Sequence, residues 1–260
     1  MKLEDRVAIV VGGGSGIGRA SSILMAKEGA KVMIADLVSE NANKTAEAIK
    51  AAGGEVSTII MDMTKEEDAN KMAQATLEKY GKIDILANIA GGSMGPNIRD
   101  SLVPFVECPK EMWDRIIDIN LNGARNCTRA VIDHMIERRY GKIVCFSSIA
   151  AINGMSGGVD YAAAKAGIIG FVKAMALEMA QYGIYVNCIT PSGTMTERIR
   201  KFMVGRQDSE RQQASITMFA EPEELAEAVL FLVSSSSDHI SGQNIIFGVP
   251  SAPAPPRQSR

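Results

Sequence analysis

Short apolar runs rich in β-branched residues alternate with stretches of helical periodicity along almost the whole chain. The runs are residues 6–11, 31–36, 56–62, 83–90, 142–148, 184–190 and 243–248. The helical stretches between them are 17–29, 39–52, 65–80, 111–138, 160–182 and 222–233. Runs that are apolar at nearly every position are typical of strands buried on both faces, and strands joined by helical crossovers are parallel. The pattern predicts one α/β domain, a doubly wound parallel sheet of about seven strands with helices on both faces.

Glycines agree with these boundaries, because each of several helical stretches is followed by glycine just before the next apolar run. These glycines are Gly29, Gly53, Gly54, Gly81, Gly141 and Gly183. Glycine adopts the left-handed conformation that ends many helices, so each is expected to stop the helix before it.

Composition excludes several classes of protein. The net charge is −2 and no basic run occurs, so a nucleic-acid partner is not expected. No run of 18 apolar residues occurs, so no membrane span is expected, and the acidic start MKLEDRVAIVV does not resemble a signal peptide. The four cysteines lack C-x-x-C spacing, and the two histidines lie far apart. We therefore expect a reducing, cytoplasmic location and no metal site.

Two segments interrupt the alternation, residues 91–110 and 191–221. Both follow predicted strands, and loops at the carboxyl ends of parallel strands border the ligand crevice of a doubly wound sheet. We expect these loops to contact a substrate. The proline-rich end, residues 250–260, is expected to be disordered, which leaves residues 1–249 as the folded domain.

A glycine cluster, GGGSGIG at residues 12–18, lies between the first predicted strand and the first predicted helix. In that context glycines let the backbone approach a pyrophosphate, whose charge is favoured at a helix N-terminus. The second strand ends at Asp36, where a carboxylate accepts hydrogen bonds from an adenosine ribose. Because a carboxylate repels a 2′-phosphate, Asp36 favours NAD over NADP, although Arg19 lies close enough in sequence to weaken that preference.

The sequence YAAAK places Tyr161 and Lys165 four residues apart, which puts both on one face of a helix. A free phenol has a pKa of about 10, too high for a base near neutral pH. An ammonium about 4 Å away, at an effective dielectric constant of about 20, favours the phenolate by about 4 kcal/mol, or about three pKa units. Burial of the phenol opposes this effect, so the figure is an upper limit.

Together with this pair, several motifs resemble those of the short-chain dehydrogenase/reductase family over about residues 4–247. They are Gly12-x-x-x-Gly16-x-Gly18, Asn88-Ile89-Ala90-Gly91, Asn120-x-x-Gly123, Ser148 thirteen residues before Tyr161, Tyr161-x-x-x-Lys165 and Asn187-x-x-x-Pro191. The resemblance implies a Rossmann-type fold and hydride transfer to or from a nicotinamide. It implies that Tyr161 is the general acid/base and that Lys165 lowers its pKa and binds the nicotinamide ribose. Ser148 would hold the substrate oxygen, and Asn120 would position a water that links Lys165 to solvent.

The same resemblance implies that Asp62 lies beside the adenine and Thr196 at the nicotinamide amide, and the charge of Asp36 favours NAD as the cofactor. The complete set of expected cofactor-binding residues is Gly12, Ser15, Gly16, Ile17, Gly18, Asp36, Leu37, Asp62, Met63, Asn88, Ala90, Gly91, Tyr161, Lys165, Pro191, Thr194 and Thr196.

Three positions in these motifs, and the end of the chain, depart from the family pattern. Val11 replaces a threonine that braces the glycine turn, Ile89 replaces an asparagine, and Ser192 replaces a glycine beside the nicotinamide. The last apolar run continues into Phe247-Gly248-Val249-Pro250 instead of Asp-Gly-Gly. None of these changes removes a proton-transfer group.

The expected substrate is a hydrophobic secondary alcohol or its ketone, because apolar and small side chains dominate the segments next to the predicted site. The apolar residues are Met94, Ile98, Ile152, Met155 and Met195, and small residues occupy most of 154–158. Cyclic alcohols, steroids and 3-oxoacyl thioesters all remain open. Arg99 and Arg115 are available to an anionic substrate, but a surface position is expected for both.

Two other functions stay open. One is an NADPH-dependent 3-oxoacyl-thioester reductase, against which Asp36 argues. The other is a non-catalytic dinucleotide-binding subunit, against which the set of Asn120, Ser148, Tyr161 and Lys165 argues. The resemblance also implies a homo-oligomer, a dimer or tetramer, formed through the helices at 111–138 and 160–182.

Overall fold

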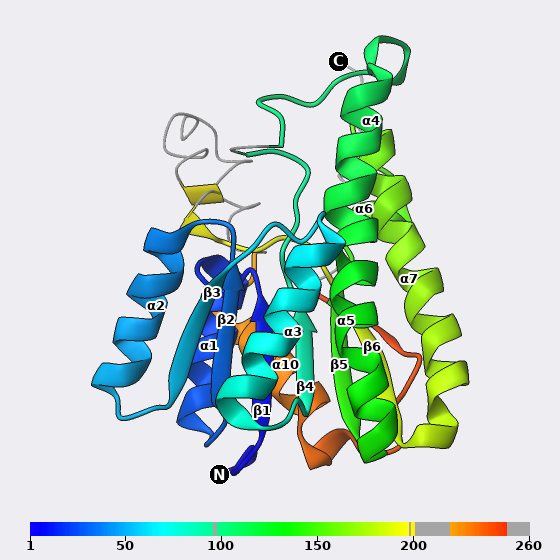
Figure 1. Cartoon of the computed structure of the whole chain (residues 1–260). Coiled ribbons are helices and arrows are strands. Elements are labelled where there is room, and N and C mark those ends of the chain that lie inside the picture. The colour runs from blue at the N-terminus through cyan, green and yellow to red at the C-terminus, as the bar shows by residue number, and fades with distance from the viewer. Residues whose placement is uncertain (96–97, 198, 201–218, 249–260) are drawn as a thin grey trace, which may run out of the picture.

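The computed structural model describes residues 1–95, 98–197, 199–200 and 219–248 (Figure 1). The strands are β1 (Val7–Val11), β2 (Lys31–Asp36), β3 (Val56–Ile60), β4 (Ile85–Asn88), β5 (Gly141–Phe146), β6 (Ile184–Pro191) and β7 (Asn244–Phe247). The α-helices are α1 (Gly16–Lys27), α2 (Ser39–Ala51), α3 (Glu66–Tyr80), α4 (Lys110–Ile117), α5 (Gly123–Arg138), α6 (Ala150–Asn153), α7 (Val159–Met179) and α10 (Pro222–Val233). Shorter helical segments are η1 (Phe105–Glu107), η2 (Asp118–Asn122), η3 (Ala180–Tyr182) and η4 (Ser235–Ser237).

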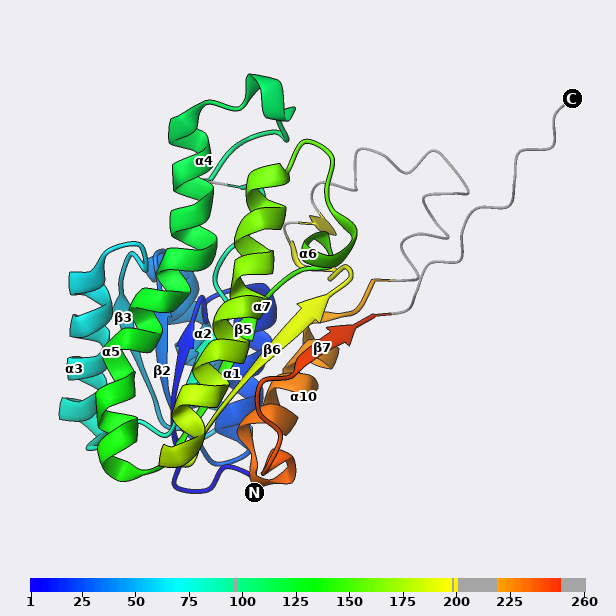
Figure 2. The same ribbon diagram turned by 90° about the vertical axis from the view of Figure 1, so that its right-hand side faces the viewer.

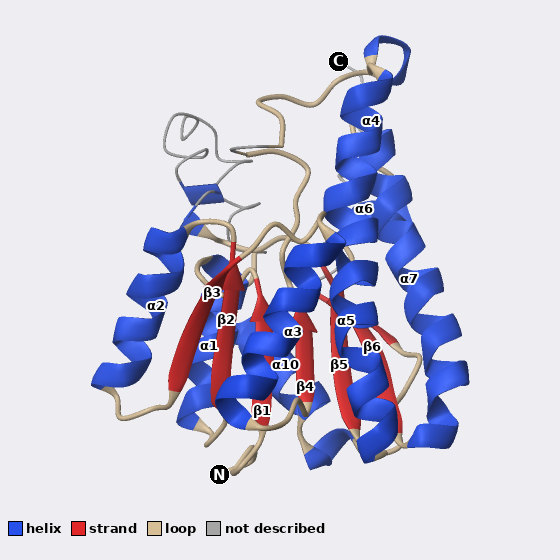
Figure 3. Ribbon diagram, viewed as in Figure 1, coloured by secondary structure: helices blue, strands red, loops and turns tan. Residues whose placement is uncertain are grey.

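The seven strands form one sheet in the order β3-β2-β1-β4-β5-β6-β7, and every neighbouring pair is parallel. The predicted doubly wound sheet is therefore confirmed. The strand order reverses between β1 and β4, where Val11 pairs with Asn88. Ligands of such sheets bind outside the carboxyl ends of the strands at this point. Figure 3 shows the loops that follow the strands gathered along that one edge.

Helices cover both faces of the sheet and create two cores. On one face, Ile9 and Val11 of β1 pack with residues of α3, α5 and α7. On the other face, Ala8 and Val10 pack with residues of α1, α2 and α10. Alternate strand residues point to opposite faces, so a strand covered on both sides must be apolar throughout. Figure 2, turned by 90°, shows the sheet between these two layers.

The predicted single helix at 111–138 is wrong, because the structure divides it into α4, a π-helical segment η2 and α5. The segment contains Asn120, whose Nδ2 donates to the backbone oxygens of Ile116 (3.1 Å) and Gly92 (3.0 Å). π-Helical bulges often occur at functional sites, where they redirect one side chain. Here the bulge turns Asn120 toward the loop after β4.

One predicted helix stop is also wrong. Helix α5 ends at Arg138, and the left-handed residue after it is Arg139, with φ of 51°, whereas Gly141 is the first residue of β5. Gly81 and Gly183 do adopt the left-handed conformation at helix ends, with φ of 77° and 69°.

The described parts of the two predicted loops lie at the carboxyl edge of the sheet. The first contains η1, and residues 96–97 fall outside the described residues. In the second, residue 198 and residues 201–218 fall outside them, as does the predicted tail at 250–260. A short helix that was not predicted, α6, follows β5.

Candidate active site

The glycine turn after β1 packs against the loops from two other strands. Gly12 and Gly16 have φ of +78° and +49°, which suits glycine. A Cβ at Gly12 would lie 2.9 Å from atoms of Ala90, and one at Gly16 would lie 3.1 Å from Thr196 Cγ2. At Gly18 a Cβ would lie 1.9 Å from the backbone oxygen of Gly12. The turn thus brings together five of the expected cofactor residues, so closely that a side chain on these glycines would collide with its neighbours.

Asp36 ends β2 with its carboxylate directed at this turn. Its Oδ2 accepts a hydrogen bond from Gly14 N (2.9 Å), and its Oδ1 accepts one from Val38 N (3.0 Å). Thr45 Oγ1 donates to Gly14 O (3.1 Å) from the side of α2. The carboxylate is therefore held in one orientation. Each oxygen keeps a further lone pair for a ligand hydroxyl.

The remaining expected cofactor residues lie along the same edge. Ser15 directly precedes α1 and has an extended conformation, and Ile17 in the first turn of α1 packs against the core. Leu37 follows β2 and is half exposed. Pro191 ends β6, and Thr194 forms a β-bridge with Ala220.

Two segments of this edge are tied to α5. Asp62 Oδ1 accepts hydrogen bonds from Thr64, and Met63 contacts α5, since a Cβ at Gly123 would lie 2.6 Å from Met63 Cε. The amide of Asn88 is also directed at α5, because Nδ2 donates to Thr128 Oγ1 (3.1 Å) and Ala124 O (3.4 Å). Asn88 Oδ1 is buried without a hydrogen-bond partner among the described residues.

Asn120 and Lys165 meet at the start of the loop after β4, and Tyr161 lies beside Lys165. A Cβ at Gly91 would lie 2.6 Å from Asn120 Oδ1 and 3.2 Å from Lys165 Nζ. Lys165 Nζ is 5.9 Å from the centre of the Tyr161 ring. Helix α7 carries both Tyr161 and Lys165, as the i, i+4 spacing predicts. An ammonium and a carboxamide thus lie next to Gly91, and the phenol lies on the same helix as the ammonium.

Lys165 is almost completely buried, at 4% exposure. Its Nζ donates a hydrogen bond to the backbone oxygen of Phe146 (2.8 Å) at the end of β5. Burial lowers the pKa of Lys165 to about 8, because desolvation disfavours the charged amine. Neighbouring Cys145 and Cys188 stay neutral, since burial raises their pKa values to about 12 and about 11. The ammonium is thus a weakly solvated cation, and its charge acts strongly on groups close to it.

Two serines after β5 complete this side of the site. Ser147 Oγ donates to the backbone oxygen of Lys165 (2.7 Å) and so fixes α7 against the sheet. Ser148 Oγ accepts a hydrogen bond from Ala150 N (3.2 Å) at the start of α6. Ser148 therefore lies at the carboxyl end of the strand next to β4, where the sequence pattern expects it.

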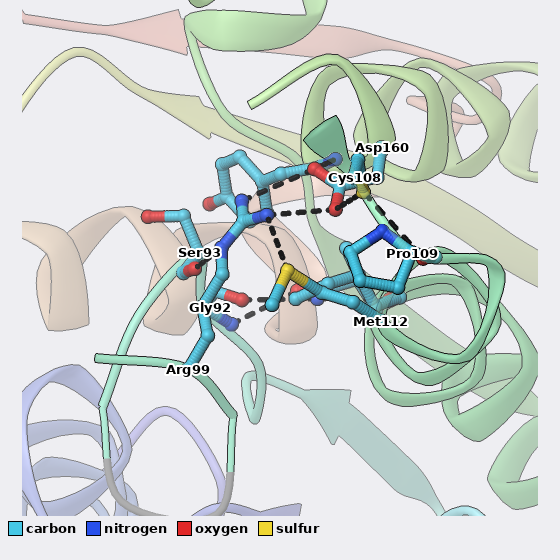
Figure 4. A network of polar contacts seen from close by, with 10 residues as sticks. Gly92, Ser93, Arg99, Cys108, Pro109, Met112 and Asp160 are labelled. Carbon is cyan, nitrogen blue, oxygen red and sulfur yellow. Dashed lines mark hydrogen bonds and ion pairs between the residues drawn. The ribbon is translucent and has the colours of Figure 1, made fainter. Parts of the chain in front are cut away.

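A buried ion pair that the sequence pattern does not predict lies at this edge. The expectation of a surface position is wrong for Arg99, which is 6% exposed and bonds both carboxylate oxygens of Asp160 (Figure 4). Asp160 directly precedes Tyr161. The only local indication is an aspartate next to Tyr161 at the start of a predicted helix. The partner of that aspartate, Arg99, is 61 residues away in sequence.

The loop at 91–110 contacts residues 154–158, another segment expected to lie next to the substrate. Val103 N donates to Gly157 O (3.0 Å), and a Cβ at Gly157 would lie 3.1 Å from Leu102 Cβ. Ile152 is 49% exposed, whereas Met195 is buried. Beside the first loop lies an open depression of about 320 Å³, lined by Gly95, Ile98, Arg99, Asp100 and Arg115.

The position of Gly91 gives a first prediction. Gly91→Ala is expected to reduce kcat about tenfold or more, because the added methyl group displaces Asn120 and Lys165, and small displacements of catalytic groups are costly. Gly53→Ala is the matched control, since Gly53 also has positive φ (+83°) but open space around it. Both variants should lose stability in thermal unfolding. Equal activity of the two would contradict the arrangement.

Comparison with known proteins gives the family. The short chain dehydrogenase family model matches residues 6–206. The chain belongs to this family. It is therefore an oxidoreductase that uses a nicotinamide dinucleotide, and the glycine turn fits the pyrophosphate of that cofactor, because the turn leads into the N-terminus of α1, where backbone N–H groups favour an anion.

Relatives match over nearly their full length. The chain is 36% identical to the 3-oxoacyl-(acyl-carrier-protein) reductase FabG of Thermotoga maritima, covering 94% of this chain and 97% of that one. It is 32% identical to the hydroxy(phenyl)methylsuccinyl-CoA dehydrogenase subunit BbsD of Thauera aromatica, covering 94% and 95%. Among solved structures, levodione reductase superposes with a TM-score of 0.85 at 29% identity, covering 95% and 97%.

Two further properties concern only the residues described above. Among them, no helix is both long and apolar enough to cross a membrane. The same residues contain no cluster of three or more His, Cys, Asp or Glu side chains placed to hold a metal ion.

Proposed function

We propose that this short-chain dehydrogenase transfers a hydride between NAD(H) and a hydrophobic secondary alcohol or its ketone, with Tyr161 as the general acid/base. The observation that carries the proposal is the position of Asn120 and Lys165 at Gly91, with the Tyr161 ring centre 5.9 Å from Lys165 Nζ. Their elements are a π-helical bulge, α7 and the loop after β4, which are far apart in sequence.

NAD would be held at the carboxyl edge of the sheet, with its pyrophosphate at the glycine turn and its adenosine ribose at Asp36. The nicotinamide supplies or accepts the hydride when it is bound. Lys165 is suited to the nicotinamide ribose, because an ammonium has three N–H donors. One of them bonds Phe146 O, and the others would be available to the ribose hydroxyls. Thr196 lies at Gly16, where the cofactor-binding turn meets the loop after β6.

Tyr161 would remove the proton from the substrate hydroxyl in oxidation and return it in reduction. The cation of Lys165 favours the phenolate over the phenol. Asn120 accepts a hydrogen bond from Gly92 N with Oδ1 (2.9 Å) and donates one to Gly92 O from Nδ2 (3.0 Å), which fixes the loop beside Lys165, and it would position a water that links Lys165 to solvent. Ser148 would donate its hydroxyl proton to the substrate oxygen, which orients the carbinol carbon.

NAD is proposed over NADP because of Asp36. A 2′-phosphate would meet a carboxylate that Gly14 N and Val38 N already hold in place. Moving that carboxylate away would break both hydrogen bonds. The repulsion between the two anions therefore cannot be relieved without the loss of these hydrogen bonds.

The preference gives a second prediction. Asp36→Asn keeps an acceptor for Gly14 N but removes the charge, so the ratio of kcat/KM for NAD to that for NADP is expected to fall about 10- to 100-fold. Glu40→Gln, an exposed charge on neighbouring α2 paired with Lys44, is the control and should leave the ratio unchanged. An unaltered ratio in Asp36→Asn would remove the argument for NAD.

A second candidate is the reduction of a 3-oxoacyl thioester. It is favoured by the names of relatives, several of which are 3-oxoacyl-(acyl-carrier-protein) reductases, while another acts on a CoA thioester. The same Tyr161 and Lys165 would carry either reaction. The two candidates differ in the substrate, which is a thioester only in the second, and in the favoured direction of the reaction.

A substrate screen distinguishes the candidates. Purified enzyme is assayed with NAD and NADP against cyclic alcohols, steroids and 3-hydroxyacyl-CoA, and with the reduced cofactors against the matching ketones and 3-oxoacyl-CoA. Turnover of simple secondary alcohols with NAD supports the proposal. Turnover confined to 3-oxoacyl-CoA with NADPH supports the second candidate, and no turnover with any pair contradicts both.

We further propose that the chain acts as a homo-oligomer, a dimer or tetramer, in the cytoplasm. Leu177 on α7 is 82% exposed, which suits a helix that a second copy covers. The four cysteines are free thiols, which suits a reducing compartment.

A further inference from the structure

A buried ion pair joins the loop after β4 to the first turn of α7. Arg99 Nη1 and Nη2 donate to Asp160 Oδ2 (2.7 Å) and Oδ1 (3.1 Å), and both side chains are 2% exposed. Figure 4 shows the guanidinium directed at the carboxylate, with Met112 and Cys108 beside them. The two bonds form a planar fork that fixes the relative orientation of the two segments.

Each partner of the pair makes further contacts that reach a third element. Arg99 Nε donates to Ser93 O (2.7 Å), and Nη1 lies 3.8 Å from Met112 Sδ on α4. Asp160 Oδ1 also accepts a hydrogen bond from Tyr161 N (2.7 Å). The loop, α4 and α7 therefore meet at a single guanidinium.

These contacts lead directly to the proposed catalytic groups. Ser93 follows Gly92, which exchanges two hydrogen bonds with Asn120. On the other side, Asp160 bonds the backbone of Tyr161. A continuous chain of bonds thus runs from Asn120 through Gly92, Ser93 and Arg99 to Asp160 and Tyr161.

We propose that Arg99 and Asp160 are a positioning pair, which fixes the loop after β4 against the start of α7 and balances the charge beside Tyr161. The proposal rests on the function proposed above for Tyr161. Neither residue is assigned to the substrate or the cofactor.

Stability alone does not account for such a pair. Two charges with 2% exposure are removed from water, and apolar side chains of similar size often replace buried pairs without loss of stability. What the pair supplies and apolar packing does not is a fixed geometry and a local neutral balance. Both matter next to a residue that must gain and lose a proton.

Other titratable groups of the described residues also lie near this pair. On α7 there is Lys165, next to Cys145 of β5 and Cys188 of β6. The loop after β4 contributes Cys108, and Asp100 and Arg115 line the depression beside Arg99 with one charge of each sign. Burial raises the pKa of all three thiols, so they are neutral near neutral pH.

Single substitutions are expected to move the pH dependence in opposite directions. Asp160→Asn leaves the cation of Arg99 near Tyr161, so the midpoint of the rise of kcat/KM with pH in alcohol oxidation should fall by about half a pH unit or more. Arg99→Met leaves the carboxylate unpaired, so the midpoint should rise by a similar amount. The double variant restores neutrality, and its midpoint should return toward that of the wild type while kcat stays about tenfold low, because the fork is lost.

The double variant guards against misfolding, since an unpaired buried charge destabilises more than removal of both charges. Arg129→Met is the matched control, because Arg129 pairs with Asp133 on the exposed side of α5 and should leave the profile unchanged. Midpoints that stay fixed in both single variants, with activity that follows the folded fraction in circular dichroism, would show a merely structural pair and overturn the proposal. If Tyr161→Phe keeps its activity, the proposed function itself fails, which is a separate result.

Discussion

Tyr161→Phe is expected to lose about 10³-fold or more of kcat in both directions, because general acid–base catalysis by one side chain contributes about 10²- to 10⁴-fold. The phenyl ring keeps the volume of the phenol and its place 5.9 Å from Lys165 Nζ, so the fold should be retained. Affinity for NAD, measured by fluorescence titration, should change by less than about threefold, since the lost hydroxyl is only one of many groups expected to contact the cofactor.

Tyr80→Phe is the control for this variant. It removes a tyrosine hydroxyl that lies 3.4 Å from Val32 O. Val32 is near the amino end of β2, whereas the glycine turn lies at the carboxyl edge of the sheet. Its kcat should match that of the wild type. If Tyr161→Phe keeps more than about one tenth of the wild-type kcat, a different group moves the proton and the assignment of Tyr161 is wrong.

Lys165→Met is expected to show opposite effects on activity and on stability. Activity should fall about 10²-fold or more, because the cation that favours the phenolate is gone and a contact to the ribose is lost. Stability at neutral pH should rise or stay equal. The folded state lowers the pKa of Lys165 from 10.5 to about 8, which corresponds to a penalty of at most about 3 kcal/mol for the buried charge.

The pH dependence of that difference follows from the same values. Between pH 8 and 10.5 the unfolded chain binds the lysine proton and the folded chain releases it, so wild-type stability gains as pH rises through this window. Below about pH 8 the wild type carries the full penalty, and the variant's advantage is greatest. Urea unfolding of both proteins at neutral pH and near pH 10 measures this difference in the free energy of unfolding. A variant that is strongly destabilised at neutral pH and equally so near pH 10 would show that the amine is not penalised by burial.

Local patterns were sufficient for the strands and for the pair on α7. Strands covered on both faces must be apolar throughout, so β1 and β2 were predicted to within one residue of their observed ends. Tyr161 and Lys165 share a helix face because alanines between them favour a regular helix. These features depend on neighbours a few residues away.

Features that depend on distant partners were not predictable. The π-helical bulge is stabilised by the bonds of Asn120 to Gly92, 28 residues away, and nothing local in 111–138 indicates it. The partner of Asp160 is 61 residues distant. Arg139 takes the left-handed conformation that a glycine two residues later was expected to take. For Asn120 and Asp160 the partner lies far away in sequence, so no local pattern could indicate it.

The departures from the family motifs have separate structural outcomes. Val11 is buried in the core beneath α3 and α5, and Ile89 packs against the core on the other face, so apolar contacts occupy both positions. Ser192 is different, because its Oγ is buried and lacks a hydrogen-bond partner among the described residues. A Cβ at Gly248 would lie 1.8 Å from that oxygen, so the changed end of β7 accommodates the changed residue after β6.

The most direct test of hydride transfer uses NADH that carries deuterium at the transferred position of the nicotinamide. The enzyme is incubated with the panel of ketones, and the alcohols are analysed by mass spectrometry. We expect deuterium at the carbinol carbon with the wild type and none above background with Tyr161→Phe. Wild-type protein that binds NADH in titration but transfers no deuterium to any ketone or 3-oxoacyl-CoA would contradict the account and favour a non-catalytic subunit.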